Sequence, residues 1–478
     1  MSLSKEQKKR IKKLSIFAVA MITISSVDSI RNLPASAKLG SQSIFYFALA
    51  AICYFIPIAL VCAELSTTYP EKGGVYLWGK KTIGQHFGFL SLWFQFAENL
   101  VFYPPLLVFI IATAIYPFSH DASHNSLVMF VSINAVFWLI TLVNIFGLKI
   151  SALFSEVFGL LGTVFPMILI CCVGFYWYFD LHNTSNLVFS WNSIIPDFHH
   201  LNIGVTFTSV ILSLTGIEIA TVYANEVKNP QKSYPIALII ATVFIITTLT
   251  LGSLAISAVI GPESATLDQG IMTFFSHFFT EINIPWLIPV IAFCIVAGGL
   301  AGLNNWIIAP IKGLSAAAED GYMPHILKHE NKYSAPVPLL IVQGIVVSLL
   351  SLIFLFIPTV NEGMWFLNIL MTQLYMLMYI SIFISFIASR IIHKERHRPF
   401  KVPGGIIGMW FVFIFGILSS SITVLLCFRP DQALKINDHF LFGIALVTGI
   451  VLFTIPAIIG IIYQIRNTVN TSKNVHTE

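Results

Sequence analysis

The chain has 478 residues, of which 56% are hydrophobic and only 10% are charged. Soluble domains carry roughly 25% charged residues, so the composition excludes an ordinary soluble protein and predicts an all-α polytopic membrane protein. The formal net charge of +4 does not indicate a nucleic-acid partner, because the basic residues gather at the ends of apolar segments.

Twelve apolar stretches are each long enough to cross a bilayer, which takes roughly 20 residues of helix. The connecting loops are short, so no soluble domain is inserted. A basic tail at 1–13 precedes the first stretch, and a short tail at 464–478 follows the last. The twelve predicted spans are about 14–38, 42–66, 86–115, 125–147, 151–179, 202–226, 234–260, 285–312, 337–358, 363–388, 405–428 and 438–463.

The distribution of lysine and arginine predicts the orientation, since these residues favour the cytoplasmic side. With the N-terminus in the cytoplasm, all but four of the 26 basic residues fall on that side. The loops at about 116–124, 180–201 and 261–284 contain none. We therefore expect an integral inner-membrane protein with both termini in the cytoplasm, and membrane lipids as its surroundings. The four exceptions are Arg31, Lys38, Arg429 and Lys435.

Two of the spans are interrupted at their centres. The first contains SSVDSIRN at 25–32, and the sixth contains SLTGIE at 213–218. Unpaired backbone groups are costly in hydrocarbon, so a break is tolerated only against protein or a water-filled cavity. The breaks are five spans apart, so the two halves of the chain have opposite orientations. Broken helices at matching positions of inverted repeats indicate the binding site of a transporter. The alternative is that Gly216 is a packing glycine and Glu218 pairs with a neighbouring helix.

The chemistry of a broken helix suits an amino acid. The N-terminus of a half-helix offers free N–H groups and a positive dipole end to a carboxylate. The unwound C-terminal end of a half-helix offers carbonyl groups to an ammonium group. A zwitterionic amino acid needs both, so amino acids are the expected substrates.

Three sequence motifs accompany the spans. They are AELSTTYPEKGGVYLWGKKTIG at 63–84, NEVKNPQKSYPIAL at 225–238 and NNWIIAPIKGLSAAAEDGYMP at 304–324. Together they resemble signatures of the amino acid–polyamine–organocation superfamily, over about residues 14–463, and within it the glutamate/GABA-type antiporters. The resemblance implies a LeuT-like fold of twelve helices that works by alternating access. Helices 1–5 (14–179) would form one inverted repeat, helices 6–10 (202–388) the other, and 405–463 two extra helices.

The resemblance also implies the site. The first break would hold the substrate carboxylate and the second its α-amino group. Trp306 would line the pocket, and Glu98 and Asn99 would face the substrate. Glu218 matches a carboxylate associated with gating and proton sensing, and Tyr375 lies near an aromatic gate position. The residues expected at the two breaks are Ser25, Ser26, Val27, Asp28, Ser29, Ile30 and Arg31, with Ser213, Leu214, Thr215, Gly216 and Ile217.

Three of these residues have a structural alternative. Trp306 could be an interfacial aromatic, because tryptophan favours the membrane surface. Glu98 could be the structural partner of another helix, since a carboxylate within a span must face the interior. Tyr375 could serve packing alone.

The first break departs from the superfamily pattern, which is rich in glycine. Here Asp28 and Arg31 stand in it. Under one hypothesis Arg31 reads an acidic or polar substrate and Asp28 helps to couple protons to transport. Under the other, the two residues form a local ion pair that stabilises the break.

The residues that usually bind the coupling ion in the relatives are also missing from this sequence. The stretch CIVAGGLAGLNN at 294–305 has no hydroxyl residue for sodium, and the fifth span has no lysine beyond Lys149. Exchange of one solute for another is then the simplest mechanism, with protons as a candidate coupling partner. A proton-coupled uptake permease for neutral or cationic amino acids is the alternative.

Other function classes find less support in the sequence. A nutrient sensor on this scaffold predicts a long soluble tail, and a channel does not need breaks at inverted positions. An enzyme is not expected, because no nucleophile–base set or phosphate-binding loop is present. The six cysteines lie in apolar runs without metal-binding spacing, so neither a metal site nor a cofactor is expected.

Overall fold

The computed structural model describes residues 15–71, 73–119, 121–146, 160–179, 187–196, 204–219, 221, 230–333, 335–429 and 439–475. Every regular element in these ranges is a helix. Eleven of the helices are long and apolar enough to cross a membrane, so the chain is a multi-pass helical membrane protein, as predicted. The predicted sixth span, 202–226, has no counterpart among the eleven, and part of it lies outside the described residues. The tail at 1–13 and the start of the fifth span also lie outside them.

The first four spans follow the predicted boundaries closely, and the described part of the fifth ends at the predicted residue. The first is divided into α2 (Ile16–Val27), η1 (Ile30–Asn32) and α3 (Leu33–Ala37). The second contains α4 (Ser43–Ala50), the π-helical turn η3 (Ala51–Phe55) and α5 (Ile56–Thr68), after the short turn η2 (Gly40–Gln42). The third, fourth and fifth are α7 (Gln85–Ile115), α8 (Ser126–Ile145), and η5 (Leu160–Val164) with α10 (Phe165–Phe179).

The second half begins with the short helix α12 (Gly204–Ser213), which ends at the second break. The longer helices that follow are α13 (Pro230–Ile260), α15 (Leu287–Glu319), α16 (Val337–Ser351) with α17 (Ile353–Phe356), α18 (Val360–Ile392), α19 (Gly405–Leu426) and α20 (His439–Val475). Shorter elements lie in the connections: α6 (Gly74–Thr82), η4 (Asp121–His124), α11 (Trp191–Ile194), α14 (Gly270–Glu281) and η7 (His325–Lys328).

Local sequence explains where several helices begin. Ser15 accepts a hydrogen bond from the Ala18 amide and so caps α2. Thr359 accepts one from the Glu362 amide and caps α18, with the acidic Glu362 in the first turn. Both are hydroxyl residues, which satisfy amides that have no partner within the helix.

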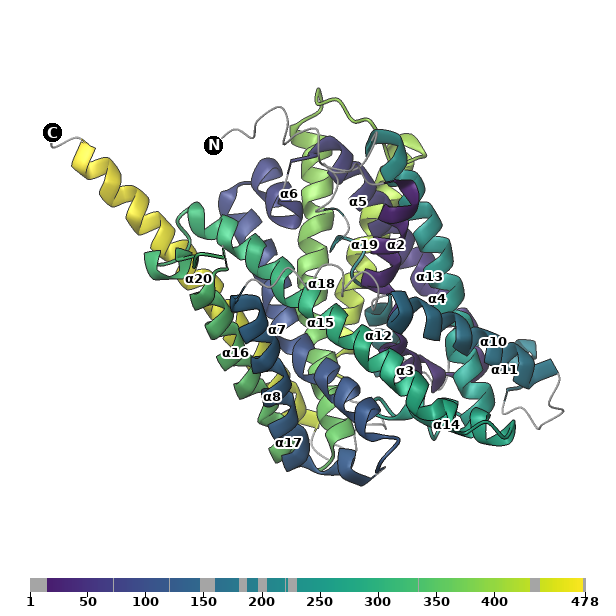
Figure 1. Ribbon diagram of the computed structural model, residues 1–478. Coiled ribbons are helices and arrows are strands. Elements are labelled where there is room, and N and C mark those ends of the chain that lie inside the picture. The colour runs from purple at the N-terminus through teal and green to yellow at the C-terminus, as the bar shows by residue number, and fades with distance from the viewer. Residues whose placement is uncertain are drawn as a thin grey trace.

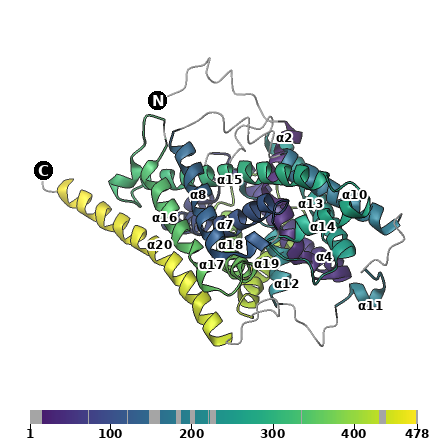
Figure 2. The ribbon, with the colours of Figure 1, turned by 60° about the horizontal axis from the view of Figure 1, so that its bottom comes forward.

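The helices α7 and α18 form the centre of the bundle, packed against each other and against α15 and α6 (Figure 1). The most apolar window of α7 is 83% buried, whereas that of α20 is 17% buried. In both views α20 runs along one edge of the bundle and its C-terminal end projects beyond it (Figure 1, Figure 2). The polar side chains that could form a site are therefore expected on α7 and α18, and the exposed apolar side chains of α20 suit contact with lipid.

Buried charges tie the C-terminal ends of α5 and α18 together. Arg390 donates two hydrogen bonds to the Glu64 carboxylate, from Nε and Nη2, at 2.6 Å each. The Val402 amide donates to the same carboxylate at 2.8 Å, and Arg398 Nε lies 3.5 Å from it. Burial lowers the pKa of the Arg398 guanidinium. Glu64 thus joins α5 to α18 and to the connection that follows α18.

A second polar contact lies at the end of α15. Lys80 forms an ion pair with Asp320 at 2.5 Å, and the Tyr76 hydroxyl donates to the same carboxylate. Burial and the hydrogen bond to Asp320 raise the pKa of Tyr76, so its hydroxyl remains a donor. This contact joins the short helix α6 to the last turn of α15.

Candidate functional site

The first break consists of two residues. Helix α2 ends at Val27; Asp28 (φ −74°, ψ 95°) and Ser29 (φ −116°, ψ 116°) are extended, and η1 begins at Ile30. The amides at the start of η1 have no acceptor within that turn. The break is shorter than predicted, because the three preceding residues are helical. Among them the Ser26 hydroxyl donates back to the Ile22 carbonyl, while Ser25 is exposed and Val27 buried.

The second break follows the last turn of α12. The hydroxyls of Ser213 and Thr215 donate to carbonyls of that turn, those of Val210 and Leu212, at 2.7 Å each. Gly216 has φ +110°, a conformation that other residues rarely adopt. Within the described part of the chain, no hydrogen bond reaches the carbonyls of Ser213, Leu214 or Thr215. These oxygens are therefore available to an external donor.

The two breaks touch each other through their backbones. A Cβ added to Gly216 would lie 2.8 Å from the carbonyl oxygen of Ser26 and 3.7 Å from the Val27 side chain. Gly216 thus supports both the conformation of the second break and its close approach to the first. Leu214 and Ile217, on either side, are fully buried. The polar backbone of both broken helices therefore meets in the interior of the bundle.

Two tyrosines of α18 bind the carboxylate of Glu218, which is 1% exposed. Tyr375 donates to its Oε1 at 2.8 Å and Tyr379 to its Oε2 at 2.5 Å. Tyr379 also accepts a hydrogen bond from the Gly216 amide at 2.8 Å. Gln95 Nε2 lies 3.5 Å from Oε1. The four-residue spacing of the tyrosines places both hydroxyls on one face of α18.

One face of α7 contributes polar side chains to the same region. Gln95, Glu98, Asn99 and Phe102 follow the spacing of neighbouring positions on a helix. Glu98 is 3% exposed, and its Oε2 accepts a hydrogen bond from Asn99 Nδ2 at 2.9 Å. The buried Glu98 carboxylate lies within electrostatic range of the acidic Glu218 and the basic Arg31.

Arg31 lies on the α7 and α18 side of the first break. Its Nη1 donates to Asn368 Oδ1 at 3.4 Å, and its guanidinium stacks over the Phe102 ring at 5.0 Å. Phe102 in turn packs against Trp306, with ring centroids 5.4 Å apart. Arg31, Phe102 and Trp306 therefore form a continuous row of a cation and two rings. Arg31 is 3% exposed, and its Nε has no hydrogen-bond partner in the described structure.

Asp28 faces α13, and not α7 and α18. Its Oδ2 is hydrogen-bonded to the Thr248 hydroxyl of α13 at 2.9 Å, and its Oδ1 has no partner among the described residues. The ion pairs found in the described structure do not include one between Asp28 and Arg31. The hypothesis of a local ion pair that stabilises the break therefore lacks its contact. The two side chains are held by separate helices instead.

Several residues of this region were missed by the sequence analysis. They complete the hydrogen bonds and ring contacts of the predicted residues. For those on α7 and α18 the only sequence signal is helical spacing from Glu98 or Tyr375. Tyr379 is the most connected, since it bonds both Gly216 and Glu218. Thr248 had no signal, because its contact with Asp28 spans 220 residues. The missed residues are Gln95, Phe102, Thr248, Asn368 and Tyr379.

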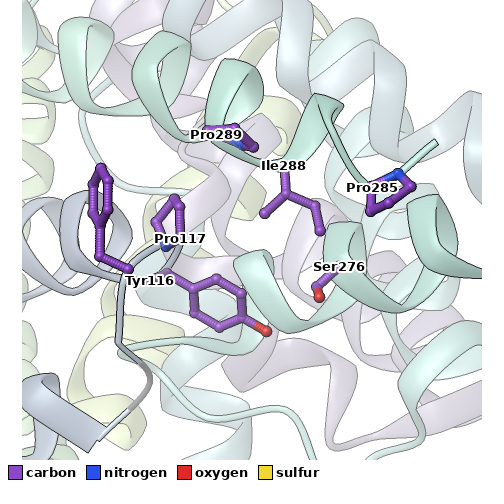
Figure 3. Close-up of a pocket in the computed structure, with 7 residues that line it drawn as sticks. Tyr116, Pro117, Ser276, Pro285, Ile288 and Pro289 are labelled. Atoms are coloured by element: carbon purple, nitrogen blue, oxygen red, sulfur yellow. The ribbon is translucent and has the colours of Figure 1, made fainter.

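A cavity of about 270 Å³ lies away from the breaks, between the end of α7, the helix α14 and the start of α15 (Figure 3). The predicted site residues do not line it. Its walls are mainly proline, aromatic and aliphatic, so it offers little for recognition of a charged substrate. It is lined by Tyr116, Pro117, Phe118, Ser276, Pro285, Ile288 and Pro289.

A multi-pass helical bundle whose two broken helices meet in its interior has the architecture of a membrane transporter. The chain belongs to the amino acid permease family, whose family model matches residues 14–469. Membership places it among transporters and not enzymes, as the sequence indicated, and confirms the resemblance to the amino acid–polyamine–organocation superfamily. The described residues contain no cluster of histidine, cysteine or acidic groups that could hold a metal ion.

Three curated relatives illustrate the family. An uncharacterised transporter of Legionella pneumophila is 39% identical over 92% of this chain and 95% of its own length. A glutamate/gamma-aminobutyrate antiporter of Lactococcus lactis is 28% identical over 95% of this chain and 91% of its own. A probable agmatine/putrescine antiporter of the same species is 24% identical over 82% of this chain and 83% of its own.

Proposed function

We propose that this protein is an inner-membrane amino acid antiporter of the glutamate/GABA type, which exchanges one amino acid for another by alternating access. The observation that carries the proposal is the contact of the two breaks, with Gly216 against the Ser26 carbonyl. It brings free amides of one half-helix and free carbonyls of another to one place inside the bundle. The antiporters related to this chain by 28% identity support exchange as the mode of transport.

In this proposal the two breaks divide the substrate between them. The amides of Ile30 and Arg31, at the start of η1, bind the α-carboxylate, because that helix end carries positive partial charge. The carbonyls of Ser213, Leu214 and Thr215 bind the α-ammonium group. The substrate side chain then extends toward α7 and α15.

The wall formed by α7 and α15 supplies the side-chain pocket. Phe102 and Trp306 offer apolar faces, and Glu98 with Asn99 offers polar groups beside them. The Arg31 guanidinium lies over Phe102 and can bind an acidic side chain of the substrate. Glu218, held by Tyr375 and Tyr379, joins the second break to α18 and acts in gating. Opening of the site toward either face requires these bonds to rearrange.

The proposed architecture follows the family. Residues 14–179 and 202–388 form inverted repeats of five helices, and 405–463 add two more. The tails at 1–13 and 464–478 lie in the cytoplasm. The break in α2–α3 and the break after α12 occupy the first span of each repeat, which supports this division. A substrate shifts the carrier between its two faces only through different affinities for them.

The test is exchange in proteoliposomes. Purified protein is reconstituted, the vesicles are loaded with one amino acid, and uptake of labelled glutamate, neutral or basic amino acids is followed at equal pH on both sides. We expect uptake into loaded vesicles and little into empty ones. Equal uptake into empty and loaded vesicles contradicts exchange. If a pH gradient alone then drives uptake, the protein is the proton-coupled permease for neutral or cationic amino acids.

A further inference from the structure

Asp28 has hydrogen-bonding geometry that a carboxylate ion does not explain. The side chain is 3% exposed, and one of its oxygens, Oδ1, has no hydrogen-bond partner in the described structure. Its other oxygen contacts only the Thr248 hydroxyl, at 2.9 Å. Buried charges in proteins are paired or richly hydrogen-bonded, and a carboxylate without either becomes neutral by taking a proton.

The Thr248 hydroxyl points to the same conclusion. It lies 2.9 Å from Asp28 Oδ2 and also 2.9 Å from the Phe244 carbonyl oxygen, which cannot donate. A hydroxyl group has a single proton to give. The hydroxyl also lies 3.2 Å from the Ile245 carbonyl oxygen, so an ionised Asp28 would have to share this one proton with two backbone acceptors. With a proton on Asp28, each contact is a full hydrogen bond: Asp28 donates to Thr248, and Thr248 donates to a carbonyl of its own helix.

Within the described ranges, no basic side chain pairs with Asp28. Helix α13 presents Thr248, and α10 presents Cys171, the titratable side chain that interacts with Asp28. Residues 160–164 of η5 contain no titratable group. Arg31 turns to Asn368 and Phe102 on the other wall. By contrast, Glu218 receives hydrogen bonds from two tyrosines, and Glu98 has Asn99 and Arg31 nearby.

We propose that Asp28 is a proton-binding site of this transporter, which holds its proton while the two breaks are closed on each other and must be protonated for the carrier to re-orient. The proton enters from water on the open side and forms an O–H bond with the carboxylate. When the break opens and is hydrated, that bond breaks, its electron pair stays on the carboxylate, and the proton returns to water. The site requires the proposed transport function for its physiological role.

Infrared spectroscopy of the purified protein tests the protonation directly. A neutral carboxylic acid has a carbonyl stretch separate from the bands of a carboxylate ion. We expect this band in the difference spectrum between the wild type and Asp28→Asn, near neutral pH and without substrate. Thr248→Val is expected to shift the same band, because the acid loses its hydrogen-bond partner. A difference spectrum that contains only carboxylate-ion bands overturns the proposal.

The pH profile of exchange tests the functional half. Exchange is measured at equal pH on both sides, over an acid-to-neutral series, and each variant is judged by the ratio of its own acid and neutral rates. We expect the wild-type rate to fall as the pH rises, because a carrier with an ionised Asp28 cannot re-orient. Asp28→Asn, which is permanently neutral, should bring the ratio close to one. Glu263→Gln removes an exposed carboxylate from an outer loop and should keep the wild-type ratio.

The two measurements separate the possible failures. If Asp28→Asn keeps the wild-type ratio, Asp28 does not control re-orientation. If it yields no folded protein, Thr248→Val replaces it, and an unshifted infrared band with an unshifted pH profile overturns the proposal. If the wild type exchanges no amino acid at any pH, the proposed function fails, whereas the infrared spectrum still decides whether Asp28 carries a proton.

Discussion

A Cβ atom added to Gly216 would lie 2.8 Å from the carbonyl oxygen of Ser26. The second break therefore packs directly against the C-terminal end of α2. The contact leaves no room for a side chain, and φ at Gly216 is +110°. Steric fit and backbone conformation therefore require glycine at the same position. The junction of the two breaks depends on this one residue.

Gly216→Ala is expected to destabilise the protein by about 1–3 kcal/mol from backbone conformation alone, and by more from the contact with Ser26. Exchange should be lost with it, because the two breaks are pushed apart. Thermal unfolding in detergent and exchange in proteoliposomes measure both effects. Gly302→Ala is the matched control, since a Cβ there meets nothing within 4 Å. Equal behaviour of the two variants would contradict the role of the junction.

Tyr379→Phe should be more harmful than Tyr375→Phe. The Tyr379 hydroxyl serves both the Gly216 amide and Glu218, whereas that of Tyr375 serves Glu218 alone. Each buried polar group left without a partner costs about 1–3 kcal/mol, and Tyr379→Phe leaves the larger number. The midpoints of thermal unfolding of the two variants, measured side by side, give the comparison. Similar midpoints would show that the Gly216 bond contributes little.

Arg31→Gln should change substrate preference. If Arg31 binds an acidic side chain, its loss removes a charge-assisted hydrogen bond worth about 1.5–3 kcal/mol, or roughly tenfold or more in affinity. Competition of glutamate and of neutral amino acids against a labelled substrate measures the preference. We expect glutamate to lose potency and neutral amino acids to keep theirs. Lys38→Gln is the control, because that ammonium lies over Trp365 and away from the aromatic row. A parallel loss for all substrates would assign Arg31 to structure instead.

Glu64→Gln should weaken the end of the bundle at which α5 meets the C-terminal end of α18. The carboxylate accepts two hydrogen bonds from Arg390 at 2.6 Å and one from the Val402 amide. Removing one partner of a buried ion pair typically costs about 3–5 kcal/mol, since the other charge remains buried. Glu71→Gln is the control: its pair with Lys81, at 3.5 Å, is exposed, and such pairs contribute about 0–1 kcal/mol. Equal midpoints of thermal unfolding for the two variants would show that the hydrogen bonds of Glu64 contribute little to stability.

Much of the fold follows from the sequence because a bilayer imposes simple rules. A helix must be about 20 residues long and apolar, and basic residues mark the inner loops. The third span was predicted at 86–115 and is found at Gln85–Ile115. The short helices α6 and α14 were not predicted, because they lie in connections between spans, where these rules do not apply.

The site could be predicted only in part. Polar residues in the middle of a span reveal a break, so the segments around Asp28 and Gly216 were found. The length of the first break was not predicted correctly. None of Ser25, Ser26 and Val27 is a residue type that must end a helix, and α2 continues to Val27. Contacts between spans that are far apart along the chain also could not be predicted from the sequence. The bond from Thr248 to Asp28 depends on how α13 packs against α2, and spacing along the chain carries no trace of it.

The extended pair Asp28–Ser29 has a mechanical consequence. Asp28 is attached to α13, whereas Arg31 is attached to α7 and α18. A backbone rotation at this pair moves one residue relative to the other, so at least one of the two attachments must break. In the proposed mechanism, the rotation that frees Asp28 for proton release therefore also changes its position relative to the cationic pocket at Arg31.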